Sequence, residues 1–120
     1  MFGVGYYLME EMIYSDKGQL ISDNVSGYKI PSCGDVPLDW DIELLNYQPT
    51  IKSGIHSSKG VGESNIQLAL SVYFAVKDAV AAARIEMGMD PVFDLGFPAS
   101  VDRVAECLPD IAEYNSRSVQ

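Results

Sequence analysis

A long apolar segment, residues 66–87, is the feature that most constrains how this chain can fold. It is rich in alanine and leucine, contains neither glycine nor proline, and runs directly into Gly88. Glycine often follows the last turn of a helix because it adopts the left-handed conformation without strain. The segment therefore predicts a helix over residues 66–87, with Ser64 or Asn65 as its N-cap. Because apolar residues occupy most of its faces, we expect this helix to be deeply buried.

A glycine-flanked carboxylate, Glu63, comes directly before this helix and follows Gly60, Val61 and Gly62. Glycines let a backbone turn tightly and approach a bound group closely. The stretch is not a phosphate-binding loop of the P-loop type, because its Lys59 precedes the second glycine instead of following it. Two interpretations of Glu63 remain. Spacing alone favours an acid stabilised by the helix macrodipole, and the alternative is a general base beside a bound ligand.

The segments on either side of the long helix predict an α/β (α+β) fold with a few short strands. Residues 2–14 fit helical spacing, although their two glycines keep a strand open as an alternative. Residues 15–18 are a turn signal between this segment and a short strand at 19–22. Residues 39–45 alternate apolar and acidic side chains, as expected of a half-buried strand.

The C-terminal part of the chain predicts one more helix. Ser100 is the expected cap of a short helix over residues 101–108, which Pro109 would end. We therefore divide the chain into residues 1–88, one part of a domain, and residues 89–120, a C-terminal extension that carries this short helix.

The charge and the cysteine usage limit the classes of partner. The formal net charge is -9 and the pI is about 4.3, which argues against nucleic acid and anionic membrane surfaces as partners. We expect no apolar run long enough to span a bilayer. The two cysteines, Cys33 and Cys107, are far apart and indicate packing residues of a reduced, cytoplasmic protein. With His56 as its single histidine, the chain by itself is predicted to hold no metal site.

Five sequence blocks follow one another in a fixed order between residues 3 and 84. They are GVGYYLMEE at 3–11, YSDKGQL at 14–20, YKIP at 28–31, SSKGVGE at 57–63 and SVYFAVKDAVAAAR at 71–84. Together they resemble the C-terminal part of the molybdopterin-binding domain of the molybdenum hydroxylases, the xanthine dehydrogenase and aldehyde oxidase family. The resemblance covers about two thirds of the chain and is specific because several blocks keep their spacing.

The resemblance implies a role for each residue of the glycine loop. Glu63 would be the catalytic base, and Gly60, Val61 and Gly62 would line the molybdenum-molybdopterin cofactor. The implied reaction is hydroxylation of an aldehyde, a purine or another N-heterocycle, with water as the oxygen donor. In the full-length protein, 2Fe-2S clusters and FAD would carry the electrons away, and the protein would be a homodimer.

The departures from the family pattern imply a fragment. The chain has no cysteine sets for iron–sulfur clusters, no FAD domain and only part of the molybdenum-binding region, so we expect it to be inactive by itself. Ser64 after the glutamate resembles aldehyde oxidases more than xanthine dehydrogenases, which typically have proline there. The alternatives are a truncated, non-catalytic product and a small acidic interaction module in which Glu63 merely caps a helix.

Overall fold

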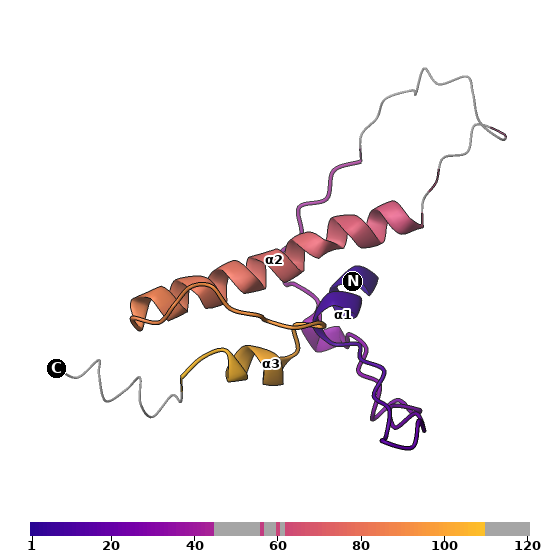
Figure 1. Ribbon diagram of the computed structural model, residues 1–120. Coiled ribbons are helices and arrows are strands. Elements are labelled where there is room, and N and C mark those ends of the chain that lie inside the picture. Colours follow the sequence, from indigo (N-terminus) through magenta and orange to yellow (C-terminus); the bar gives the residue numbers. More distant parts are fainter. Residues whose placement is uncertain (45–55, 57–59, 61, 110–120) are drawn as a thin grey trace.

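The computed structural model describes residues 1–44, 56, 60 and 62–109. Three α-helices and one short 3-10 helix are the regular elements of this part of the chain: α1 (Phe2–Leu8), η1 (Cys33–Asp35), α2 (Glu63–Glu86) and α3 (Val101–Glu106). Helix α2 forms the long axis, and α1 and α3 lie along the same side of it (Figure 1). Residues 9–30 project away from the helices beyond the end of α1 and turn back on themselves, with one antiparallel bridge between Tyr14 and Leu20; we call this segment the hairpin (Figure 1).

The predicted α/β fold is wrong for the described residues, which contain no sheet. The expected strand at 19–22 is reduced to one antiparallel bridge between Tyr14 and Leu20. The predicted strand at 39–45 is absent from the described residues, because residues 39–44 are irregular and exposed. Leu45, the last residue of that prediction, lies outside the described residues. Alternating polarity creates a strand only where a second strand accepts its backbone hydrogen bonds, and the described part of the chain supplies none.

Helix α2 confirms the main prediction, with one correction at its start. It begins at Glu63 with Gly62 as N-cap, one turn earlier than expected, so neither Ser64 nor Asn65 caps it. At its other end the chain leaves the helix through Gly88, whose φ of 73° is left-handed. The helix therefore ends within one residue of the predicted end at residue 87, just before Gly88.

The expectation that this helix is deeply buried is wrong for the chain as it stands. Val80 is its one buried residue, and Leu68, Phe74 and Ile85 are 75%, 52% and 60% exposed. By length and composition, α2 is also the one helix among the described residues that is apolar enough to cross a membrane. The prediction that no apolar run is long enough to span a bilayer is therefore wrong by length and composition. Core helices of soluble proteins have the same length and composition, so this result alone does not indicate a membrane span.

Two glycines allow α1 to pack closely on its neighbours. Gly3 and Gly5 are buried, and a Cβ built on Gly3 would lie 2.2 Å from the Cβ of Ala69 in α2. A Cβ on Gly5 would lie 2.5 Å from the ring of Pro31. The glycines that weaken α1 as an isolated helix are thus the residues that let it pack against α2 and the chain after the hairpin.

The segment between α2 and α3 returns along α2 and covers part of it. Phe97 lies 5.3 and 5.7 Å from the rings of Tyr6 and Tyr7, and the Tyr73 hydroxyl donates to the carbonyl oxygen of Gly96 over 2.8 Å. Arg84 stacks on the Phe93 ring and donates to the carbonyls of Asp90 and Cys107. The buried apolar residues of this small core are Tyr7, Val80, Leu95 and Ala99.

Helix α3 confirms the predicted cap position but is shorter than expected. Ser100 is its N-cap, although the serine side chain makes no capping hydrogen bond, and the helix ends at Glu106, two residues before the predicted end. The boundary between a unit at 1–88 and an extension at 89–120 stays a prediction.

Two adjacent glutamates at the end of α1 anchor distant parts of the chain. Glu10 accepts a 2.6 Å hydrogen bond from the Tyr28 hydroxyl, and Glu11 forms an ion pair with Arg103 of α3. These contacts connect residues 18 and 92 positions apart. Each carboxylate therefore has a specific partner from a distant part of the chain.

Much apolar surface lacks a partner within the described residues. Among their large apolar side chains, Phe2 is 89% exposed, Leu38 101% and Leu44 87%. The small core therefore covers only part of the apolar side chains that the structure describes.

Candidate functional site

The candidate site lies at the N-terminal end of α2, where the chain enters the helix. Gly60, Gly62, Glu63 and Ser64 line a surface depression of about 460 Å³. The structure thus brings three of the four predicted site residues together around one hollow. Val61 lies outside the described residues. Glu63 occupies the first helical position and is exposed.

The two site glycines differ from the packing glycines of α1. A Cβ built on Gly60 or Gly62 would meet no atom of the described chain within 4 Å, and neither residue has a left-handed φ. Among the described residues, neither internal packing nor a left-handed backbone therefore explains glycine at these two positions. The open backbone beside the carboxylate is what close approach of an external group requires.

The start of α2 also lacks a side-chain cap. Gly62 is the N-cap and has no side chain to accept a hydrogen bond from the first turn. The first N–H groups of a helix have no partners within the helix, and together with the macrodipole they favour anionic groups. This end of α2 combines an exposed carboxylate with backbone donors, so it suits a ligand that offers both acidic protons and acceptor oxygens.

The start of α1 also borders this site, although α1 lies about sixty residues earlier in the sequence. A second hollow of about 380 Å³ lies between the two helices, and Gly62 borders both hollows. Its lining comes from the start of α1 and the first turns of α2: Met1, Phe2, Gly3, Val4, Gly62, Asn65, Ile66 and Ala69. Gly3 is the residue in the sequence that could have indicated this contact. Because it has no side chain, α1 can lie against α2 next to the glycine loop.

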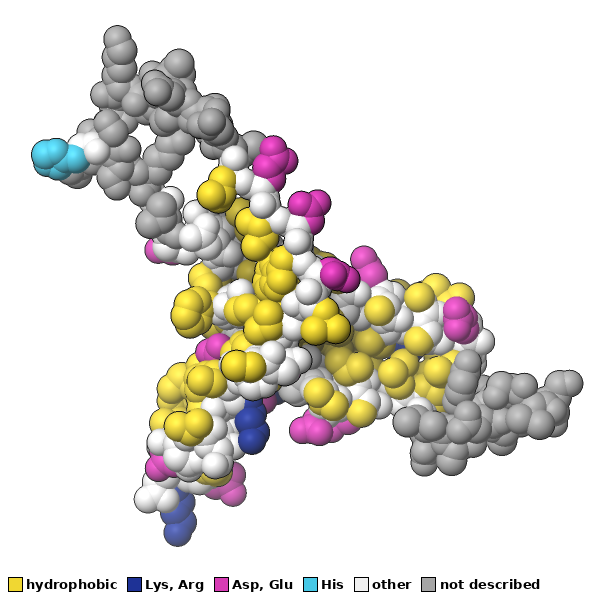
Figure 2. Space-filling model, turned by 180° about the vertical axis from the view of Figure 1, so that it is seen from behind, with side chains coloured by type: hydrophobic (Ala, Val, Ile, Leu, Met, Phe, Trp, Pro, Cys, Tyr) yellow, Lys and Arg dark blue, Asp and Glu magenta, His cyan; other side chains and the backbone are white. Residues whose placement is uncertain are grey.

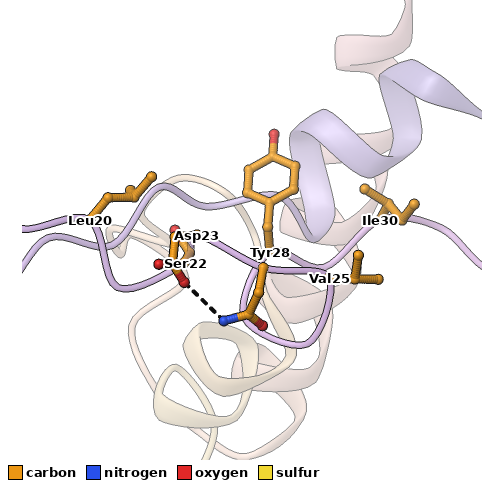
Figure 3. Close-up of a pocket in the computed structure, with 7 residues that line it drawn as sticks. Leu20, Ser22, Asp23, Val25, Tyr28 and Ile30 are labelled. Atoms are coloured by element: carbon orange, nitrogen blue, oxygen red, sulfur yellow. Dashed lines mark hydrogen bonds between the residues drawn. The ribbon is translucent and has the colours of Figure 1, made fainter.

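A further hollow lies in the projecting hairpin, away from Glu63. It has a volume of about 360 Å³ and is lined by Leu20, Ser22, Asp23, Asn24, Val25, Tyr28 and Ile30 (Figure 3). The Asn24 amide donates to Asp23 over 2.9 Å, and its carbonyl oxygen accepts from the backbone of Ser26 and Gly27. The hydrogen bond to Glu10 is the main cause that raises the pKa of Tyr28 above its ordinary 10.0. These polar groups have structural partners, so the hairpin hollow shows no chemistry of its own.

The other candidate residues carry no additional site. His56 is exposed and has a left-handed φ of 52°. Cys33 is exposed, which contradicts a packing role, whereas Cys107 is half-buried with its thiol 3.6 Å from the carbonyl oxygen of Asp94. No group of three or more histidine, cysteine, aspartate or glutamate side chains suited to a metal ion occurs among the described residues.

Comparison with known proteins connects the N-terminal part of the chain with a cofactor class. Residues 1–37, which include α1 and the hairpin, match the family model of a molybdopterin cofactor-binding domain. Over 107 residues the chain is 42% identical to a xanthine dehydrogenase from Dictyostelium discoideum, a match that covers 88% of this chain and 8% of that protein. It is 40% identical over 108 residues to aldehyde oxidase 3 from Mus musculus, covering 90% of this chain and 8% of the relative.

The chain belongs to the xanthine dehydrogenase and aldehyde oxidase family. A xanthine dehydrogenase/oxidase from Gallus gallus is also 40% identical over 108 residues, so the two branches of the family match at nearly equal identity. The chain spans about 8% of the length of these curated relatives. The family is one of oxidoreductases, and the matched region places this chain in its molybdopterin-binding part.

Proposed function

We propose that this chain is the segment of a molybdenum hydroxylase that carries the general base, and that Glu63 is that base. The observation that carries the proposal is the exposed carboxylate at the start of α2, bordered by two glycines whose open faces have no neighbour in the described chain. Membership of the family and the match to a molybdopterin cofactor-binding domain support the same assignment.

The residues at this end of α2 fit the molybdenum-molybdopterin cofactor. The glycines at positions 60 and 62 leave room for a flat ring system against the backbone. Gly60, Val61 and Gly62 would hold the cofactor from one side through their backbone. When bound, the cofactor supplies the two-electron redox chemistry of the reaction.

Glu63 performs proton transfer in this proposal. Its carboxylate accepts a proton from the water-derived oxygen donor, which makes that oxygen a stronger nucleophile toward an electrophilic carbon. Aldehydes, purines and other N-heterocycles present such a carbon and form the proposed substrate class. Ser64 favours an aldehyde oxidase over a xanthine dehydrogenase. In the full-length cytoplasmic homodimer, we expect 2Fe-2S clusters and FAD to accept the electrons.

A Glu63→Gln substitution in a complete protein that contains this segment tests the proposal. We expect a loss of turnover on the order of a hundredfold or more, because a positioned base contributes about that much to a rate. Molybdenum content, measured by elemental analysis, should remain that of the wild type. Glu106→Gln, an exposed glutamate of α3, is the matched control and should keep full turnover. Unchanged turnover in Glu63→Gln would refute the role of this residue.

A further inference from the structure

Arg103 of α3 connects the C-terminal part of the chain with α1, and the proposed site does not use it. Its Nη2 atom forms an ion pair with Glu11, and its Nη1 atom donates to the carbonyl oxygen of Pro98 over 3.2 Å. The side chains of the ion pair are 30% and 35% exposed, so water screens the pair only in part. Because a planar guanidinium group holds its acceptors in a fixed geometry, it orients them better than a lysine ammonium group would.

The partner of Arg103 lies far away in the sequence although acidic groups lie nearby. The chain has 17 acidic residues against 8 basic ones, and Figure 2 shows acidic groups scattered among hydrophobic side chains. Asp94 and Glu106 line the same hollow as Arg103, yet the guanidinium group pairs with Glu11, 92 positions away. A pair that only neutralised charge could form locally. This one fixes α3 relative to the end of α1.

The backbone before α3 is shaped around Arg103. Gly96 has a left-handed φ of 72°, and a Cβ built on it would lie 3.2 Å from the Cδ atom of Arg103. Two hydrogen bonds of 2.8 Å attach the same segment to both other helices. The N–H of Ala99 donates to the carbonyl oxygen of Tyr7 in α1, and the Tyr73 hydroxyl of α2 donates to the carbonyl oxygen of Gly96. Arg103 therefore extends an attachment that the backbone begins.

The chain between α1 and Glu11 follows the helix closely. The N–H groups of Met9 and Glu10 both donate to the carbonyl oxygen of Gly5, over 2.8 and 2.9 Å. Helix α1 has seven residues, which span about 10 Å, and its backbone hydrogen bonds keep it together as one unit. A shift of Glu11 is therefore expected to move α1 as a whole.

The opposite end of α1 borders the candidate site. Gly3 packs against Ala69 of α2, and the hollow at this contact is shared with Gly62. Residues 1–4 form the α1 side of that hollow. If α1 loses its attachment at Glu11, it can tilt about the contact at Gly3, and the wall beside Gly62 then moves.

We propose that Arg103 is a positioning residue for the hydroxylation reaction, acting through Glu11 and α1 on the backbone at Gly62. This inference rests on the proposed function, because Gly62 directly precedes the proposed base, Glu63. A misplacement of about 1 Å caused by a distant mutation can cost about a hundredfold in rate. Residues that touch neither ligand typically change coupling by amounts equivalent to about two- to thirtyfold. Since other contacts of α1 remain, we expect a loss on the order of fivefold in kcat.

Kinetics of a complete protein that contains this segment test the positioning role, with benzaldehyde and hypoxanthine as probe substrates. In Arg103→Gln, kcat per bound molybdenum should fall on the order of fivefold while KM stays within about twofold, because the change affects orientation and not binding. A merely structural role would lower the molybdenum content or the stability and leave kcat per bound molybdenum unchanged. Arg103→Lys keeps the charge but loses the forked geometry, so it should restore only part of kcat.

A double-mutant cycle identifies the contact through which Arg103 acts. Glu11→Gln should lower kcat per bound molybdenum as much as Arg103→Gln, and the double variant should lose no more, because both changes break one contact. Asp102→Asn, at an exposed neighbouring position of α3, is the matched control and should keep the wild-type kcat. Losses that add in the double variant, or an unchanged kcat per bound molybdenum in Arg103→Gln, would overturn the proposal.

Hydrogen exchange read by mass spectrometry follows α1 without any turnover. In the complete protein, with or without molybdenum, the N–H groups of Met9 and Glu10 should exchange about two- to fivefold faster in Arg103→Gln than in the wild type, because a partly exposed ion pair no longer closes this end of α1. Asp102→Asn should leave this exchange unchanged. Equal exchange in Arg103→Gln and the wild type would also overturn the proposal.

The positioning role and the proposed function can fail separately. Turnover that Glu63→Gln leaves intact refutes the base. Turnover that Glu63→Gln abolishes and Arg103→Gln leaves unchanged refutes only the positioning role of Arg103.

Discussion

The contact between Gly3 and Ala69 sets how closely α1 approaches α2, and Gly3→Ala tests it. The new Cβ would lie 2.2 Å from the Cβ of Ala69, whereas carbon atoms in contact are normally about 3.5–4.0 Å apart. The two helices would therefore have to separate by more than a small side-chain adjustment allows. Because α1 also borders the hollow next to Gly62, the same change should displace that wall.

Two opposing effects decide the sign of the stability change. Replacing glycine by alanine within a helix stabilises it by up to about 1 kcal/mol. Overpacking a close contact costs about 1–3 kcal/mol, and the severity of this overlap places Gly3→Ala at the upper end. We therefore expect a net loss of about 2 kcal/mol in the free energy of unfolding. Without the contact, the substitution would be stabilising.

Urea unfolding followed by circular dichroism at 222 nm measures this loss. For a chain of this size, it corresponds to a midpoint shift on the order of 1 M. Adding Ala69→Gly removes the clashing atom and leaves the Ala69 Cα 3.7 Å away, an ordinary contact, so the double variant should recover most of the loss. Gly34→Ala, whose Cβ would meet only the Ser32 hydroxyl at 3.6 Å, should be nearly neutral. Equal or higher stability of Gly3→Ala would refute the predicted close packing.

Three further predictions concern the polar contacts. Glu10→Gln should lower the pKa of Tyr28 toward 10.0, measured by absorbance at 295 nm. Because folding raises this pKa, the stability that the Tyr28–Glu10 hydrogen bond contributes is present below pH 10. It is lost as pH rises through the folded pKa of Tyr28. The backbone N–H of Ser32 is the larger cause that lowers the pKa of Asp35, and the Ser32 hydroxyl is the smaller one. Ser32→Ala removes only the hydroxyl, so it should raise this pKa part of the way toward 3.8, measured by NMR titration. The stabilisation from these bonds is present above pH 3.8 and lost on acidification through the folded value. Glu11→Gln should cost about 0.2–1 kcal/mol at low salt and less at 1 M NaCl, measured by thermal unfolding, because the side chains of its ion pair are 30% and 35% exposed.

Local sequence patterns predicted the helices well. The end of α2 and the cap position of α3 follow from Gly88 and Ser100, because these effects act within a turn of the chain. The turn at residues 15–18 is also confirmed, with Gly18 at a φ of 76°. The strands at 19–22 and 39–45 could not be predicted reliably, since a strand depends on a partner that local sequence does not specify.

The roles of Gly60, Val61, Gly62 and Glu63 stay a prediction, which rests on their being consecutive in the sequence. The structure adds that Gly60, Gly62 and Glu63 line one depression. The wall contributed by α1 was missed because it comes from residues about sixty positions earlier. The anchoring roles of Glu10 and Glu11 were missed for the same reason: their partners, Tyr28 and Arg103, are distant in the sequence.

The sequence by itself determined the long helix, the glycine-flanked glutamate at its start and the family to which the chain belongs. These properties depend on neighbouring residues and on ordered motifs. Only the tertiary structure decided that Gly3 is a packing residue and that Gly60 and Gly62 are open. It also decided that most of α2 stays uncovered by the residues that the structure describes, with Val80 as its one buried residue. Burial and contact depend on which distant atoms meet across the fold, and in this chain those atoms cover only part of its apolar surface.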